Sequence, residues 1–108
     1  IVHLPGQTLG SIGVIYTPPE AGAEPVLFSG KALGWSRDLG MLDGFSQFTE
    51  VSMKKQADAI RSLAGERFTW ILPAHGSRYR FANPDNKADI LFEAADRFLE
   101  RGRQPALL

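Results

Sequence analysis

Short apolar runs, separated by polar segments rich in proline and glycine, make up the first third of the chain. Residues 10–16, GSIGVIY, combine β-branched and aromatic side chains, which is typical of a strand. The segment TPPEAGAEP at residues 17–25 predicts a polar connection, and PVLFSG at residues 25–30 is the expected hairpin partner. The apolar side chains of residues 26–28 are consecutive, which predicts a strand covered on both faces and a layered core.

The pattern changes to a helical period at Ser52. Apolar residues then fall on one helical face, which predicts an amphipathic helix over residues 52–64. We expect Ser52 to cap the N-terminus of this helix and Gly65 to provide a left-handed turn after its last residue. The apolar positions on this face are Met53, Ala57, Ile60, Leu63 and Ala64.

A third apolar run and a second helical stripe occupy the last third of the chain. Residues 68–72, FTWIL, predict a buried strand that Pro73 stops. The pair Asn83–Pro84 suits the N-cap and first position of a final helix that ends at Gly102. Residues 103–108 are expected to fray. The apolar stripe of this last helix consists of Ala88, Leu91, Phe92, Ala95, Phe98 and Leu99.

Residues 31–50 contain glycines and large apolar side chains without a strand or helix period, which predicts an ordered loop with one helical turn. The predicted order is strand, strand, loop, helix, strand, loop, helix. Two helices cover one face of such a sheet and leave the other face in need of a partner layer. The pattern therefore predicts an α/β (α+β) fold class and a single partial domain over residues 1–108.

Composition narrows the function classes. Twelve basic and twelve acidic residues cancel, so net charge gives no argument for nucleic acid or for an anionic membrane. The absence of cysteine excludes disulfides and thiolate zinc sites. No apolar run is long enough to cross a bilayer, so no membrane insertion is expected. Because the chain starts without Met inside an apolar strand pattern, we expect a missing N-terminal half of the domain as one partner.

The two histidines, His3 and His75, each lie close to a proline and a glycine at a predicted strand end. A catalytic zinc usually takes three protein ligands and an open position. At least one carboxylate would therefore have to join the histidines, and Asp38 and Asp43 are the nearest by sequence. For His3, a surface or hydrogen-bonded histidine is the preferred interpretation.

Three segments together resemble the C-terminal half of the metallo-β-lactamase fold superfamily. They are HLPGQTLGSIGVIY, VLFSGKALGWS and FTWILPAHGSRYRF, in that order. Members of the superfamily carry an H-x-P-G-H-T turn, a strand ending in T/S-G-D and a strand ending in P-G-H-G. The longer match resembles the glyoxalase II-like branch, especially plastid and cyanobacterial members. The resemblance implies that this chain is the C-terminal half of a four-layer αββα sandwich, with a two-metal site at its strand ends.

Carried over onto this chain, the resemblance leaves one metal ligand position filled, by His75. Gln7 stands where the turn has a ligand histidine, and Lys31 stands where an aspartate would bridge the two metals. Neutral glutamine is a poor zinc ligand, and an ammonium group repels divalent cations. We therefore expect no cofactor, and we expect Lys31 to form a salt bridge with remaining acids or to bind an anion. Zinc is expected only if ligands outside this chain complete the site.

Three functions are compatible with these residues. The leading hypothesis is a degenerate, non-catalytic metallo-β-lactamase-like domain that serves as a structural or interaction module in a larger assembly with another protein chain. The alternative is a metal-dependent thioester hydrolase of glyoxalase II type, completed by the missing N-terminal half. The third is RNA or anion binding through Arg78, Tyr79 and Arg80, where basic and aromatic side chains alternate. The resemblance implies a plastid location, with a bacterial cytoplasm as the other option.

Overall fold

The computed structural model describes residues 1–103 as a mixed α+β chain with a five-stranded sheet, a two-stranded sheet and two α-helices. Residues 104–108, which hold most of the segment expected to fray, lie outside the described residues. In chain order the elements are β1 (Val2–His3), β2 (Ile12–Tyr16), β3 (Val26–Gly30), β4 (Gly34–Ser36), β5 (Met41–Asp43), η1 (Ser46–Phe48), α1 (Met53–Ser62), η2 (Leu63–Gly65), β6 (Trp70–Pro73), β7 (Tyr79–Arg80), η3 (Pro84–Asn86) and α2 (Lys87–Arg103).

The larger sheet has the strand order β1-β2-β3-β6-β7. Strands β2 and β3 form the predicted antiparallel hairpin, with Val14 opposite Phe28. Strand β6 is parallel to β3, with Ile71 opposite Leu27, and α1 lies in the crossover that a parallel pair requires. The short strands β1 and β7 extend the sheet at its two edges, so it has five strands where the pattern predicted three.

Strands β4 and β5 form a separate antiparallel hairpin within residues 31–50. The predicted loop is wrong here, because strands of three residues are too short to show an alternating pattern. Gly40 makes the turn between them with a φ of 65°, and its N–H donates to the carbonyl of Ser36 at 2.8 Å. The expected helical turn is present as η1.

The N-terminal cap of α1 is confirmed, and its predicted C-terminal cap is wrong. Ser52 Oγ accepts a hydrogen bond from the N–H of Lys55 at 3.1 Å. At Leu63 the helix tightens into η2, and Gly65 does not take the left-handed conformation. The tighter turn satisfies a free carbonyl instead, since the N–H of Glu66 donates to the Leu63 carbonyl at 3.0 Å.

The second helix starts where it was predicted to start, but its buried residues differ from the predicted apolar stripe. Asn83 Oδ1 accepts from the N–H of Asp85 at 2.9 Å, and Pro84 opens η3, which leads into α2. Helix α2 continues through Gly102 to Arg103, one residue beyond the predicted end. Phe92 is 43% exposed, so its place in the predicted stripe is wrong. The buried positions of α2 are Lys87, Leu91, Ala94, Ala95 and Phe98.

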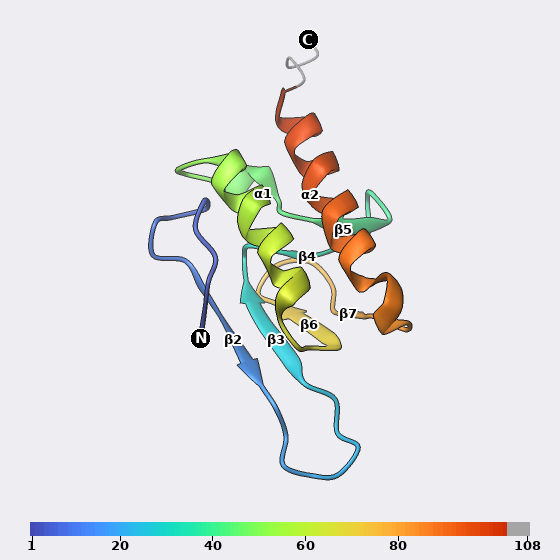
Figure 1. Ribbon diagram of the computed structural model, residues 1–108. Coiled ribbons are helices and arrows are strands. Elements are labelled where there is room, and N and C mark those ends of the chain that lie inside the picture. Colours follow the sequence, from blue (N-terminus) through green and yellow to red (C-terminus); the bar gives the residue numbers. More distant parts are fainter. Residues whose placement is uncertain (104–108) are drawn as a thin grey trace.

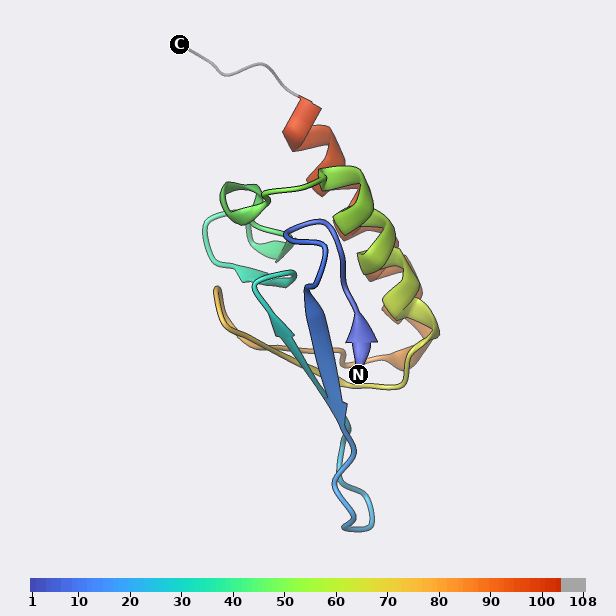
Figure 2. The ribbon, with the colours of Figure 1, turned by 90° about the vertical axis from the view of Figure 1, so that its left-hand side faces the viewer.

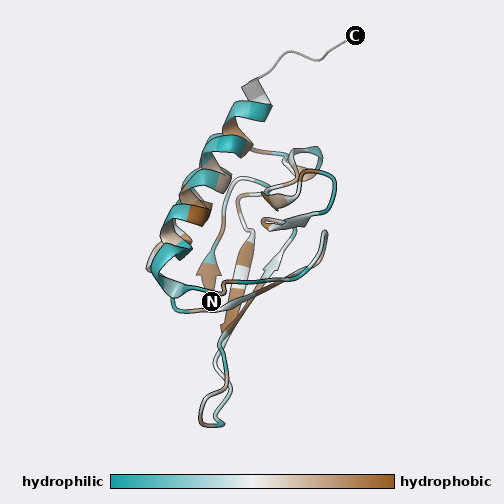
Figure 3. Cartoon of the chain, turned by 90° about the vertical axis from the view of Figure 1, so that its right-hand side faces the viewer, coloured by the Kyte–Doolittle hydropathy of each residue, from teal (hydrophilic) through white to brown (hydrophobic). Residues whose placement is uncertain are grey.

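Both helices pack side by side on one face of the larger sheet (Figure 1; Figure 2). Hydrophilic and hydrophobic residues alternate along α2, as expected for a helix with one buried side (Figure 3). No helix within residues 1–103 is long and apolar enough to cross a membrane. The core between the helices and the sheet includes Leu27, Ile71, Ala57, Ile60, Leu91 and Phe98.

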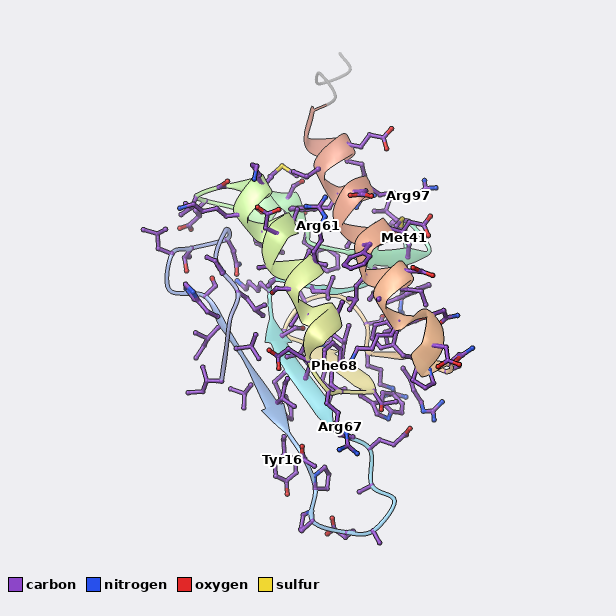
Figure 4. The ribbon with its side chains drawn as sticks, viewed as in Figure 1. Tyr16, Met41, Arg61, Arg67, Phe68 and Arg97 are labelled. Atoms are coloured by element: carbon purple, nitrogen blue, oxygen red, sulfur yellow. The ribbon has the colours of Figure 1, made fainter. Side chains whose placement is uncertain are left out.

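The opposite face of the sheet carries exposed apolar side chains from β2 and β3. We call Ile12, Val14, Tyr16 and Phe28 the outer face; they are 50%, 43%, 53% and 45% exposed. In Figure 4, Tyr16 lies on β2 close to the connection that leads to β3. The prediction that β3 is covered on both faces is therefore wrong for the described chain. The prediction that helices cover one face and leave the other open agrees with this arrangement.

Candidate functional site

The ends of β3 and β6 meet at one edge of the sheet, because the two strands are parallel. Gly30 at the end of β3 is opposite Pro73 at the end of β6, and the N–H of Ala74 donates to the Gly30 carbonyl at 2.7 Å. Lys31 follows Gly30 directly, and His75 follows Pro73 after one intervening residue, Ala74. The fold therefore brings two of the three residues singled out at metal-ligand positions to the same edge.

His75 is half-buried between two phenylalanine rings at this edge. Its ring is edge-on to Phe45, with centroids 4.6 Å apart, and edge-on to Phe48 at 4.8 Å. The ammonium of Lys31 lies 4.8 Å from the centroid of the same Phe48 ring. Within residues 1–103, Lys31 makes no ion pair, so the expected salt bridge has no partner in the part of the chain that the structure describes.

The turn containing Gln7 is docked against the start of α1. The carbonyl of Gly6 accepts hydrogen bonds from the N–H groups of Val51 and Ser52, at 3.1 and 2.8 Å. The carbonyl of Gln7 accepts from the N–H of Glu50 at 2.8 Å. These bonds fix the backbone of the turn to the segment that precedes α1. The Pro-Gly turn thus has a structural role that requires no metal.

Gln56 on α1 joins the loops around this edge and was missed by the sequence analysis. It is 1% exposed, and its Nε2 donates to the carbonyls of Ala32 and Gly44 at 2.9 and 2.7 Å. Its Oε1 accepts from the hydroxyl of Thr49 at 2.6 Å. In the sequence, Gln56 could have been recognised as a polar residue on the apolar face of the predicted helix, three positions after Met53.

The other candidate metal ligands are dispersed. His3 lies on an edge strand and donates from Nε2 to the carbonyl of Leu9 at 2.8 Å. Asp43 is nearly buried and is paired with Arg101 of α2. Asp38 lines an open cavity of about 350 Å³ together with His75.

These positions do not supply the donor set of a two-metal centre. Among residues 1–103, no group of three or more histidine, cysteine, aspartate or glutamate side chains is placed to hold a metal ion. The cavity that contains His75 offers one imidazole and the carboxylate of Asp38. A catalytic zinc site takes three protein ligands, so the described residues fit such a centre poorly.

The segment Arg78–Arg80 is divided between different partners. Arg80 forms a two-point ion pair with Glu24, from Nε at 3.0 Å and from Nη2 at 2.7 Å. The hydrogen bonds from Arg80 and from Trp70 hold the pKa of Glu24 below its ordinary value. The hydrogen bond to Glu24 in turn raises the pKa of Arg80. Tyr79 stacks on Trp35, with centroids 5.2 Å apart and nearly parallel rings.

Of the three residues predicted to bind RNA or an anion, Arg78, Tyr79 and Arg80, only Arg78 has a side chain without a partner among the described residues. A base-stacking platform needs an open ring face. The Tyr79 ring stacks on Trp35 and also packs at a right angle to Phe81, with centroids 5.0 Å apart. Arg78 is exposed and makes no ion pair with any described residue.

A second residue that the sequence analysis missed is Lys87, which is 8% exposed at the start of α2. Its Nζ donates to the carbonyls of Glu66 and Phe68 at 2.7 and 2.8 Å, and it lies 3.6 Å from the centroid of the Phe68 ring. Burial lowers the pKa of Lys87. The signal was its position four residues before Leu91 on the buried side of α2.

We compared the chain with protein-family models, with curated proteins and with solved structures, and found no match in any of the three.

Proposed function

We propose that this domain is a degenerate, non-catalytic member of the metallo-β-lactamase fold superfamily that serves as a structural or interaction module in a larger assembly. The observation that carries the proposal is the outer face, Ile12, Val14, Tyr16 and Phe28, which exposes four large apolar side chains on neighbouring strands. Exposed apolar residues gathered on one surface typically mark a contact with another protein or layer.

The geometry of the outer face suits a flat apolar partner such as a second sheet. Val14 is directly opposite Phe28 across the hairpin, so their side chains stand on the same face of the pleated sheet. Each outer-face side chain is about half exposed, and covering it would contribute on the order of 1 kcal/mol. Four such residues would contribute about 4 kcal/mol, which favours a contact that also includes other parts of the assembly. The four-layer sandwich implied by the sequence resemblance has a second sheet at this position.

The edge that holds His75 supports the non-catalytic part of the proposal. Phe48 contacts both Lys31 and His75, and Phe45 covers the other side of the imidazole. An ammonium group thus stands where the resemblance has a bridging aspartate, and aromatic rings pack against the retained ligand position, His75. An ammonium group beside such a pocket disfavours a pair of divalent cations.

Site-specific photo-crosslinking tests the outer face. A benzophenone side chain placed at Phe28 is expected to crosslink to one defined partner in the cells that produce the protein. Phe92 on α2 is the matched control, since it is also a phenylalanine and is 43% exposed, against 45% for Phe28. Equal crosslinking from both positions, or none from Phe28, would contradict the proposal.

Metal analysis tests the catalytic alternative. The purified assembly is expected to contain no stoichiometric zinc and to leave an acyl-glutathione thioester intact. Stoichiometric zinc together with thioester hydrolysis that depends on His75 would favour the hydrolase instead.

A further inference from the structure

Two arginines that form no ion pair with any described residue line one pocket beside the β6–β7 connection. Arg37 and Arg78, with Ser77 between them in the lining, border an open pocket of about 500 Å³. We call it the arginine pocket. Its remaining walls are Leu72, Pro73 and Gly76.

The backbone holds the two arginines on adjacent segments. Trp35 of β4 and Ser77 form an isolated antiparallel bridge, with reciprocal N–H to carbonyl hydrogen bonds of 3.0 and 2.8 Å. Gly76 precedes this bridge with a φ of 84°, and a Cβ atom there would come within 2.8 Å of the Trp35 carbonyl. The close approach keeps the end of β4, where Arg37 follows, against the segment that carries Arg78.

The guanidinium of Arg37 is oriented by one hydrogen bond and retains free donors. Its Nε donates to Ser77 Oγ at 2.9 Å. An arginine carries five N–H donors, and the two terminal amino groups of Arg37 have no hydrogen-bond partner among residues 1–103. The side chain is therefore positioned without being neutralised.

The charge in the arginine pocket is uncompensated by described residues. Arg61, for comparison, lies between α1 and α2 (Figure 4) and pairs with Asp58 and Asp96 at 2.9 and 2.6 Å. Neither Arg37 nor Arg78 has a carboxylate within ion-pair distance in residues 1–103. No acidic residue is among those that line the pocket. Asp38 lines the adjoining cavity, which shares Arg37, Gly76 and Ser77 with the arginine pocket.

We propose that the arginine pocket binds the phosphate group of a small phosphomonoester, through the guanidinium groups of Arg37 and Arg78. A phosphomonoester carries a charge of about −1.5 to −2 at pH 7, which two guanidinium groups balance. Arginine also matches phosphate oxygens with pairs of parallel hydrogen bonds. Leu72 and Pro73 provide an apolar wall for the carbon part of the ester. The pocket adjoins the outer face, since Leu72 is opposite Phe28 in the β3–β6 pair, but the proposal does not depend on the proposed module function.

Nuclear magnetic resonance titration with propyl phosphate tests the proposal, with sodium chloride at matched ionic strength as the blank. We expect saturable shifts in the amide signals of residues 36–38 and 72–78. Arg37→Gln and Arg78→Gln should each weaken binding about tenfold or more, because hydrogen bonds to charged groups are the strong ones. Asp38→Asn should strengthen binding, since it removes a nearby negative charge.

The matched control is Arg67→Gln. Arg67 is exposed and without an ion pair among described residues (Figure 4). It lies before the start of β6, whereas the arginine pocket lies at the end of that strand. Its substitution should change the affinity less than twofold. Equal weakening by Arg67→Gln, or shifts that chloride reproduces, would overturn the site. Sodium acetate that binds as tightly as propyl phosphate would overturn the assignment to a phosphomonoester. Thermal unfolding of each variant checks that it is folded.

Discussion

Gly6 lies so close to Gln56 that a Cβ atom on Gly6 would come within 2.3 Å of the Gln56 backbone nitrogen. Gly6 also has a φ of 130°, a conformation that residues with a side chain rarely adopt. Both features belong to the Pro-Gly turn that docks on α1 through the Gly6 carbonyl. The turn therefore depends on glycine for packing as well as for backbone conformation.

We expect Gly6→Ala to lower the free energy of unfolding by about 3 kcal/mol or more, because backbone strain and overpacking add. Urea unfolding followed by circular dichroism measures the change. Gly10→Ala in the same segment is the matched control, since Gly10 has nothing within 4 Å of the added Cβ. A Gly6→Ala variant as stable as Gly10→Ala would show that the turn is not held against α1.

Gln56→Met should destabilise the protein by about 2 to 4 kcal/mol. The substitution preserves the approximate volume but leaves the carbonyls of Ala32 and Gly44 and the hydroxyl of Thr49 without their partner in the interior. Urea unfolding again gives the difference. Gln47→Met is the control, because Gln47 is an exposed glutamine in the same region. Similar stabilities of the two variants would refute the role of Gln56 in joining the loops.

Local sequence patterns were sufficient to predict the strands and helices that are longer than one repeat of the hydrophobic pattern. The β2–β3 hairpin, the Ser52 cap and the apolar stripe of α1 follow from residues close in sequence. The sequence placed Lys31 and His75 each after a predicted strand, and the parallel pairing of these strands, which the pattern did not predict, brings the two residues to one edge. The short strands β4, β5 and β7 escaped prediction because two or three residues hold no complete pattern, whereas the strand pattern at the start of the chain is present as β1.

Contacts between distant residues account for what the sequence could not provide. Arg80 and Glu24 are 56 positions apart, and nothing in the segment SRYRF indicates that one of its arginines is neutralised. Asp43 read as a possible metal ligand until the fold placed Arg101 beside it. The identity of a polar side chain is visible in a sequence, whereas its partner depends on tertiary packing.

The Glu24–Arg80 pair predicts a loss of stability in acid. Because the pKa of Glu24 is lowered in the folded protein from its ordinary value of 4.5, the folded state binds fewer protons than the unfolded state in the window below that value. The advantage of the protein over Glu24→Gln should be full above pH 4.5 and disappear as the pH falls through the lowered pKa. Urea midpoints measured from pH 7 to pH 3 test this. A constant difference over that range would exclude the linkage.

Lys87 predicts the opposite pH dependence at the alkaline end. Burial lowers its pKa below the ordinary 10.5, so the unfolded state binds more protons between the two values and the stability rises with pH there. The free energy of unfolding of the protein, relative to Lys87→Met, should therefore increase as the pH is raised toward 10.5. At pH 7, Lys87→Met should be less stable by about 1 to 3 kcal/mol, because the carbonyls of Glu66 and Phe68 lose their donor. Urea unfolding of both proteins at several pH values from 7 to 10 measures the difference between their free energies of unfolding. If this difference becomes smaller as the pH rises, burial does not control the titration of Lys87.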